Sequence, residues 1–405
     1  MKEYVLFLCG GEWQLPWIQY FKKKGHNIIL VDPNDNPPCI RYCDLFVQLD
    51  VKNIQGIKDY VIENQLTISL VTSEQTDVSC VPVAELSQHF KTKSIPPTVT
   101  NFFCNKYVSR EHVKLINQTV IPKFSSVNCS EDIWEFLQEQ NSMIVVKPAD
   151  LQSSRGISFL DENSTKQEVN IAFASAIEYS NTRQVLAEAF ISGTEITVEG
   201  IVINNRHHIL AMSRKSHFRN GIASELSYPL ITNIGLEKEI RSNHNKLIES
   251  TGINFGLTHS EYIIDEQTKK FYLIEMACRG GGTLIPSHIV PWVSGINIYD
   301  IYYDSLMGIP LESDLIPDSK SSLLHFFEFP SGKVKSVIGE EECRKMTEVI
   351  EFRLEFKEGE YIFPAEDDRG RQGFVIILAE DQLKIREILD LVYKKIKIRY
   401  YDNIQ

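Results

Sequence analysis

The stretch LIEMACRGGG (Leu273–Gly282) places a carboxylate inside an apolar run that is typical of a buried strand. Arg279 and the glycines Gly280–Gly282 follow shortly after Glu275. A lone buried carboxylate is unfavourable unless it is paired, hydrogen-bonded or bound to a metal ion. The fold therefore has to supply a partner for Glu275.

A second carboxylate, Glu261, lies upstream in a segment that is predicted to form a β-hairpin with the first. If Glu266–Lys270 form the loop and Asp265 faces Phe271, then Glu261 faces Glu275. Directly opposed residues have Cβ atoms about 5 Å apart on one face of a sheet. Either the two glutamates share a Mg²⁺ ion, which prefers hard oxygen ligands, or a loop one residue shorter or longer puts one glutamate on each surface.

The composition indicates a globular chain of several domains. It has 405 residues, of which 43% are apolar and 24% charged, enough for about two to four domains. The net charge of −12 argues against a nucleic-acid-binding protein, which carries a basic surface. No stretch approaches the roughly 20 apolar residues of a membrane helix, and the amino-terminal apolar run ends in glycines, which predicts a strand and not a signal peptide. We therefore expect a cytoplasmic protein with no membrane or nucleic-acid partner.

The eight cysteines are scattered along the chain: Cys9, Cys39, Cys43, Cys80, Cys104, Cys129, Cys278 and Cys343. Only Cys39 and Cys43 are close in sequence, and no second pair or histidine cluster accompanies them, so a zinc site is not expected. We interpret all eight as reduced thiols of a cytoplasmic protein.

The order of elements divides the chain into regions. About the first ninety residues alternate apolar strands with helices, which predicts a parallel sheet covered by helices. Residues 93–101 contain paired prolines and are predicted to be a linker. From 143 to 203 the pattern predicts strand, loop, strand, helix, strand and strand, and further helices are predicted at 291–308 and 382–395.

Two segments carry residue types that suit a nucleotide. Lys147 closes an apolar strand, and a small polar loop that ends at Gly156 follows it. A lysine and the backbone N–H groups of such a loop can bind phosphate, although most lysines in this context are surface residues. Glu188 and Glu195 flank a turn, where a carboxylate at a strand end can accept hydrogen bonds from a ribose diol or can lie on an exposed edge.

In order, Lys106, Lys147, the small-residue loop, EAFISGTE, HSE and IEMACRGGG resemble the ATP-grasp superfamily of carboxylate–amine or carboxylate–thiol ligases. The start of the chain resembles a pre-ATP-grasp domain, the tail resembles the C-terminal domain of the biotin-carboxylase and L-amino-acid-ligase branch, and IEMACRGGG resembles a carbamoyl-phosphate-synthase-like branch. The resemblance implies an α/β fold, α+β in parts. It divides the chain into a Rossmann-like domain at 1–95, a two-lobed ATP-grasp domain at 96–310 with its lid at about 141–203, and a small C-terminal α+β domain at 311–405.

The resemblance also implies roles for individual residues. It assigns the phosphates of ATP to Lys106 and Lys147, beneath a lid formed by Ser153, Ser154 and Gly156. Glu188 begins a hinge whose backbone at Ala189, Phe190 and Ile191 reads adenine, and Glu195 holds the ribose hydroxyls. Glu261 and Glu275 ligate one or two Mg²⁺ ions, and Arg279 faces the reacting phosphoryl group and the substrate carboxylate.

The chain departs from the family pattern at two places. Many members have glycine at the positions of Leu151 and Ser153, so this lid is expected to be stiffer. Many have asparagine two residues after the second metal-binding glutamate, where this chain has Ala277. One ligand of a two-magnesium site is therefore missing, whereas a single bridging ion keeps both of its glutamates.

Four residues near these motifs have two interpretations each. His259 is either a core histidine or a group that orients the metal ligands or acts as a base. His288 either lines the acceptor pocket or has no role in it. Lys215 and Arg219 either face the substrate or belong to a solvated basic turn, and we expect the turn.

The implied reaction turns a carboxylate into an acyl phosphate with release of ADP, and an amine of an amino acid or related small metabolite then attacks it. One alternative is a non-catalytic nucleotide-binding regulator with the same fold. Another is an NAD-dependent oxidoreductase, because Asp32 ends the second strand, but Gly-x-Gly-x-x-Gly is absent after Gly10. Members of the family are often dimers, so a homodimer is one expected assembly.

Overall fold

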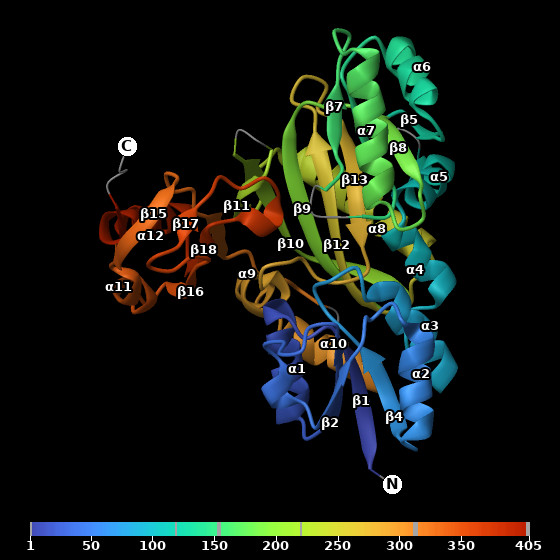
Figure 1. The fold of residues 1–405 in the computed structure, drawn as a ribbon, viewed down its shortest axis with the longest axis vertical. Coiled ribbons are helices and arrows are strands. Elements are labelled where there is room, and N and C mark those ends of the chain that lie inside the picture. The colour runs from blue at the N-terminus through green and yellow to red at the C-terminus, as the bar shows by residue number, and fades with distance from the viewer. Residues whose placement is uncertain (1, 118–119, 152–154, 219–220, 311–314, 402–405) are drawn as a thin grey trace.

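The structure is a computed structural model that describes residues 2–117, 120–151, 155–218, 221–310 and 315–401. Four sheets organise these residues. Figure 1 shows the amino-terminal sheet at the bottom, the longest strands above it, and the carboxy-terminal part at the left.

The amino-terminal sheet has four parallel strands in the order β3-β2-β1-β4, as predicted. They are β1 (Glu3–Leu8), β2 (Asn27–Asp32), β3 (Leu45–Gln48) and β4 (Thr67–Thr72). These strands are almost continuous apolar runs because helices cover both faces. One face packs against α1 (Leu15–Lys23) and α10 (Ile298–Met307), and the other packs against α2 (Ile54–Glu63) and α3 (Cys80–Phe90). The carboxyl ends of the strands, where ligands bind in such sheets, point toward the rest of the molecule (Figure 1).

A small antiparallel sheet has the order β5-β8-β6-β7. Its strands are β5 (Phe124–Val127), β6 (Ile144–Pro148), β7 (Ser158–Leu160) and β8 (Val185–Ala189). Two helices, α6 (Ser130–Gln140) and α7 (Lys166–Tyr179), bury one face of it. The other face, which includes Val145 and Lys147, lines a cavity. The element order predicted for 143–203 is confirmed.

The central sheet has eight strands in the order β13-β12-β9-β10-β11-β14-β18-β16. They are β9 (Thr194–Ile203), β10 (Arg206–His217), β11 (Ala223–Tyr228), β12 (Gly256–Ile264), β13 (Phe271–Ala277), β14 (Ser321–Phe326), β16 (Val349–Leu354) and β18 (Gly373–Ala379). Helix α8 (Ile234–Ser250) packs against one face through Ile240 and Leu247. Since three strands come from residues 321–379, the sheet crosses the expected domain boundary at residue 311, and the division into domains stays a prediction.

The carboxy-terminal part adds a second core. Helices α11 (Glu340–Arg344) and α12 (Gln382–Lys395) pack on β14, β16 and β18. A small sheet beside them has the order β17-β15-β19, with β15 (Gly332–Ile338), β17 (Tyr361–Ile362) and β19 (Lys397–Tyr400). The helix predicted at 382–395 is confirmed.

Two predictions of local structure are wrong. The linker predicted at 93–101 already contains the start of α4 (Pro97–Cys104), because proline suits the first position of a helix, and α5 (Lys106–Asn117) follows it. The single helix predicted at 291–308 is two, α9 (Val290–Ser294) and α10. Gly295 separates them with a φ of 69°, the left-handed conformation that ends helices.

Candidate active site

The two glutamates of the hairpin face each other, as predicted, but the register around them differs from the prediction. Phe271 lies opposite Ile264 and not opposite Asp265, because Asp265 belongs to the turn, where its side chain accepts hydrogen bonds from two backbone amides. A β-bulge at Ile274 then adds one residue to β13 and brings Glu275 opposite Glu261. The turn moves the pairing by one residue in one direction and the bulge moves it back by one, so Glu261 and Glu275 are paired as predicted.

The carbonyl of the bulged residue has a partner from a distant helix. Arg110 of α5 is fully buried and donates from Nη2 to the oxygen of Ile274 at 2.7 Å. Its Nε donates to Glu188 Oε1 at 2.5 Å, and the amine of Lys147 contacts the other oxygen of the same carboxylate. Arg110 therefore connects the small sheet to the bulge that sets the position of Glu275. No local sequence signal marked it.

The Lys147–Glu188–Arg110 cluster lies in a low-dielectric environment that shifts its titration. Burial lowers the pKa of the Lys147 ammonium, and Glu188 opposes this effect. Burial by itself would raise the pKa of the Glu188 carboxyl, but the charges of Arg110 and Lys147 outweigh it and lower that pKa. Glu188 therefore stays ionised as the shared partner of two cations.

Each of the two hairpin glutamates also faces a cation. Lys106 Nζ lies 3.4 Å from Glu275 Oε2 and donates to the carbonyl of Leu151 at 2.6 Å. Lys215 Nζ lies 2.8 Å from Glu261 Oε1 and 2.5 Å from Glu195 Oε1. The expectation of a solvated turn is wrong for Lys215, because it belongs to β10 directly opposite Glu195 on β9. Arg219 lies outside the described residues.

His259 is a core histidine that also touches the site. Its Nδ1 lies 2.7 Å from Glu199 Oε1, and its Nε2 lies 3.4 Å from Glu261 Oε1. Burial alone would lower the pKa of His259, but Glu199 outweighs it and raises the pKa to about 9. The imidazole is thus protonated at neutral pH and is not a base there. Burial also opposes ionisation of Glu261, but Lys215 and His259 hold the pKa of that carboxyl well below its usual range.

The arginine–glycine loop after β13 is anchored by the segment that follows β4. Arg279 donates to Asp77 Oδ2 from Nε at 2.9 Å and from Nη2 at 2.5 Å. Gly280 N donates to Glu74 Oε1 at 3.0 Å, and a Cβ at Gly280 would lie 2.3 Å from Pro286 Cγ, so glycine is required. Burial raises the pKa of Glu74 to about 7 and that of Asp77 to about 6. A run of polar residues at the carboxyl end of a parallel strand was the available sequence signal for both.

These groups surround one large cavity of about 1900 Å³. Ten of the predicted residues line it: Lys106, Lys147, Glu188, Ala189, Phe190, Ile191, Glu195, Glu261, Glu275 and Arg279. Gly156 and His288 are not among its lining residues, although the neighbours Arg155 and Ile157 are. Ser153 and Ser154 lie outside the described residues.

The carboxy-terminal part contributes arginines and their paired carboxylates to the wall of the same cavity, which the sequence did not reveal. The guanidinium of Arg371 lies 3.8 Å from the ring centroid of Phe326 and donates to Asp368, and its buried Nε has no hydrogen-bond partner among the described residues. Arg353 lies over the ring of Trp13 and contacts Glu12, which reaches the cavity from the amino-terminal part.

Family models match two parts of the chain. Residues 140–287 match the ATP-grasp domain, and residues 325–401 match the L-amino acid ligase C-terminal domain 2. No curated protein sequence matches the chain.

Solved structures resemble the chain over nearly its whole length. An L-amino acid ligase from Bacillus licheniformis has a TM-score of 0.81 at 18% identity, over 99% of each chain. A phosphoribosylglycinamide synthetase from Anaerococcus prevotii has a TM-score of 0.74 at 19% identity, over 98% of this chain and 100% of that one. A biotin carboxylase from Campylobacter jejuni has a TM-score of 0.73 at 17% identity, over 98% of this chain and 92% of that one.

The predicted fold class is confirmed by these likenesses, and none of the helices in the described ranges is long and apolar enough to cross a bilayer. These matches show an ATP-grasp domain at residues 140–287 and a C-terminal domain of the L-amino acid ligase type at residues 325–401, within a chain whose fold resembles that of ATP-grasp ligases over nearly its whole length.

Proposed function

We propose that the chain is an ADP-forming carbon–nitrogen ligase that activates a carboxylate as an acyl phosphate and joins it to an amine. One observation carries this proposal. Glu261 and Glu275 lie opposite each other on neighbouring strands, at the wall of the cavity that Lys106, Lys147 and Arg279 also line. Such a ligase needs a metal site, cationic phosphate ligands and an arginine around one space, and this arrangement offers candidates for all three.

The donor set fits ATP with Mg²⁺. Glu261 and Glu275 offer only hard oxygen ligands, which suit Mg²⁺. Each carboxylate pairs with a lysine, so both positions favour a positive charge. Ala277 adds no oxygen where many relatives have asparagine, which supports a single ion completed by phosphate oxygens and water. The bound ion would neutralise the phosphate charge and fix its orientation.

The rest of the nucleotide has candidate partners along the hinge. The amides of Ala189 and Phe190 already donate to backbone carbonyls, whereas the amide of Ile191 has no hydrogen-bond partner among the described residues. We therefore assign adenine recognition to the Ile191 N–H. Glu195 keeps the proposed ribose role, in which the ribose hydroxyls would replace Lys215 and His217 as its partners. Glu188 is buried, so it acts through Lys147 and Arg110.

In the proposed reaction, a carboxylate oxygen of the substrate attacks the γ-phosphorus of ATP, the bond to the β-phosphate oxygen breaks, and ADP leaves. Lys106 and Lys147 stabilise the charge on the phosphate oxygens, and Arg279 holds the carboxylate in line for the attack. The neutral amine then attacks the acyl carbon and loses its proton to solvent as phosphate departs. Positioning and charge stabilisation do the catalytic work, so no nucleophilic side chain is needed.

We propose an amino acid or a related small metabolite as substrate. The match of residues 325–401 to the L-amino acid ligase C-terminal domain supports this class. Arg371 and Arg353 line the same part of the cavity, and a guanidinium can bind a carboxylate through two N–H groups. Glu12 and Glu355 line the cavity nearby and suit an ammonium group.

The test is a phosphate-release and ADP-release assay with pooled carboxylates and amines. Glu275→Gln should reduce turnover at least about a hundredfold without unfolding the chain, because it removes one of two metal ligands. Glu266→Gln is the matched control, since Glu266 lies in the exposed turn of the same hairpin and should retain activity. Turnover that survives Glu275→Gln would contradict the metal assignment.

The same assay separates the alternatives. A non-catalytic regulator would bind ADP with Mg²⁺ but release no phosphate with any substrate pool. An oxidoreductase is disfavoured by Asp32, whose Oδ2 accepts from Gly10 N at 2.7 Å and whose Oδ1 accepts from Asn34 N at 2.9 Å. Both oxygens of Asp32 thus accept hydrogen bonds from backbone amides of neighbouring loops, so they are not free to bind the ribose of a dinucleotide.

A further inference from the structure

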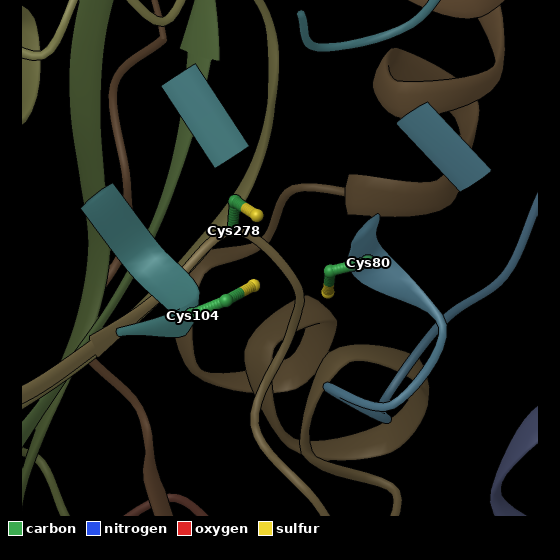
Figure 2. Close-up of side chains that lie close together, drawn as sticks. All are labelled: Cys80, Cys104 and Cys278. Carbon is green, nitrogen blue, oxygen red and sulfur yellow. The ribbon is translucent and has the colours of Figure 1, made fainter. Parts of the chain in front are cut away.

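Three of the cysteines that are scattered in the sequence meet in the fold. The Sγ atoms of Cys80, Cys104 and Cys278 all lie within 4.8 Å of one another. Figure 2 shows the three thiols directed into one shared space from separate segments. Cys80 begins α3, Cys104 ends α4, and Cys278 follows β13 directly. All eight cysteines are free, in line with the interpretation as reduced thiols, but their scatter in the sequence does not extend to these three in space.

The cluster adjoins the proposed active site without being part of the nucleotide machinery. Cys104 lines the large cavity, whereas Cys80 and Cys278 line a separate cavity of about 40 Å³. Each of the three is a close chain neighbour of a residue of the site: Asp77, Lys106 and Arg279, respectively. Whatever joins the three sulfur atoms would also tie together the segments that hold these residues.

We propose that Cys80, Cys104 and Cys278 bind a thiophilic divalent metal ion, with Zn²⁺ as the best fit. Zinc–sulfur bonds of about 2.3 Å in tetrahedral geometry place ligand sulfurs about 3.8 Å apart, so the described cluster needs only a small contraction. A disulfide would use two of these sulfurs and leave one thiol, whereas a metal ion uses all three.

Charge and ligand chemistry select zinc over the alternatives. Thiolates prefer soft or borderline ions, so Mg²⁺ would remain at the oxygen ligands of the proposed nucleotide site. Three thiolates around Zn²⁺ carry a net charge of about −1, against about −2 around Cu⁺, and the smaller charge is less costly in a partly buried place. A water molecule would supply the fourth ligand of the tetrahedron.

A metal ion at this site would cross-link segments that are far apart in the chain. Binding of the ion would fix the end of α4 next to Lys106 and the loop that carries Arg279. Structural zinc sites contribute directly to folding because the ligands are not preassembled in the unfolded chain. This role is independent of the proposed ligase activity, so each can fail without the other.

The test starts from the full chain, which is stripped with a chelator, reloaded with Zn²⁺ and analysed by elemental mass spectrometry. We expect about one zinc per chain for the wild type and for Cys43→Ser, a partly buried cysteine outside the cluster, and less than about one tenth for Cys104→Ser and Cys278→Ser. Loading with Co²⁺ should give a sulfur-to-metal charge-transfer band in the wild type and in Cys43→Ser, but not in Cys104→Ser or Cys278→Ser. Glu275→Gln should keep both signals, which separates this site from the carboxylate pair.

A second measurement needs no variant that has to fold. In the wild-type chain, Zn²⁺ should slow alkylation of Cys80, Cys104 and Cys278 at least about tenfold and leave Cys43 unchanged, because only thiolates bound to the ion are protected. Equal alkylation rates with and without Zn²⁺, a reloaded chain without zinc, or Co²⁺ bound without the charge-transfer band would each overturn the proposal.

Discussion

Replacement of Arg110 by methionine tests how the buried cation network supports the proposed metal site. Arg110 is fully buried and bridges Glu188 to the bulge carbonyl of Ile274. In Arg110→Met, Glu188 keeps Lys147 as its partner, so the carboxylate is not left alone in the interior. The carbonyl of Ile274, however, loses its donor.

The expected loss follows from these two contacts. Leaving a buried carbonyl without a partner costs about 1–3 kcal/mol. Loss of one of two cations from Glu188 adds less than the roughly 3–5 kcal/mol of an orphaned buried charge, because Lys147 remains. We expect a total of about 3 kcal/mol, which corresponds to a fall of about 6–12 °C in the melting temperature of a domain of this size.

The assay is thermal unfolding with and without ADP and Mg²⁺. Because the bulge brings Glu275 opposite Glu261, Arg110→Met should also reduce the stabilisation that Mg²⁺ with ADP provides. Lys114→Met is the matched control, since Lys114 lies one turn further along the same helix and its side chain is 54% exposed. It should change the unfolding free energy by less than about 0.5 kcal/mol. An Arg110→Met protein with wild-type melting temperature and wild-type response to ADP would refute this account of the bulge.

Three further predictions concern ion pairs elsewhere. Asp77→Asn should lower kcat about tenfold or more while the KM for ATP stays nearly constant, because Arg279 loses the charged partner that orients it; steady-state kinetics that show an unchanged kcat would contradict this. Lys215→Met should lower the melting temperature of the free chain and increase the gain from Mg²⁺ with ADP, since Glu261 and Glu195 lose their shared cation; an equal gain in both proteins argues against it. Burial by itself would raise the pKa of Glu225, but its hydrogen bond with Arg386 outweighs it and lowers the pKa to about 2. This stabilisation is present above about pH 4.5 and is lost as the pH falls toward 2. Glu225→Gln should therefore lower the free energy of unfolding by about 1 kcal/mol at pH 7, a value that allows for the half-exposed side chain of Arg386, and by almost nothing near pH 2. Urea unfolding at the two pH values measures the difference.

The sequence alone determined the parts of this protein that depend on local pattern. Alternating side chains and a short loop predicted that Glu261 and Glu275 share one face of a hairpin, and apolar strands that end in polar residues pointed to Lys147 and Glu188. These predictions hold because neighbouring strands of a hairpin are close in sequence, so strand periodicity constrains which side chains meet. The precise register did not follow, since the Asp265 side chain takes part in the turn through its own hydrogen bonds, and the bulge at Ile274 has a partner, Arg110, from outside the hairpin.

Only the tertiary structure decided which distant groups become partners. Arg110 with Glu188, Arg279 with Asp77, and Lys215 between two glutamates are contacts between elements that the sequence does not relate to one another. The same is true of the three cysteines, whose spacing carries no metal-binding signature. Residue type and the period of the pattern determine the face of a helix or strand on which a side chain lies. The packing of whole elements determines which residue lies across from it. Burial of apolar surface drives that packing, and it does not depend on separation along the chain.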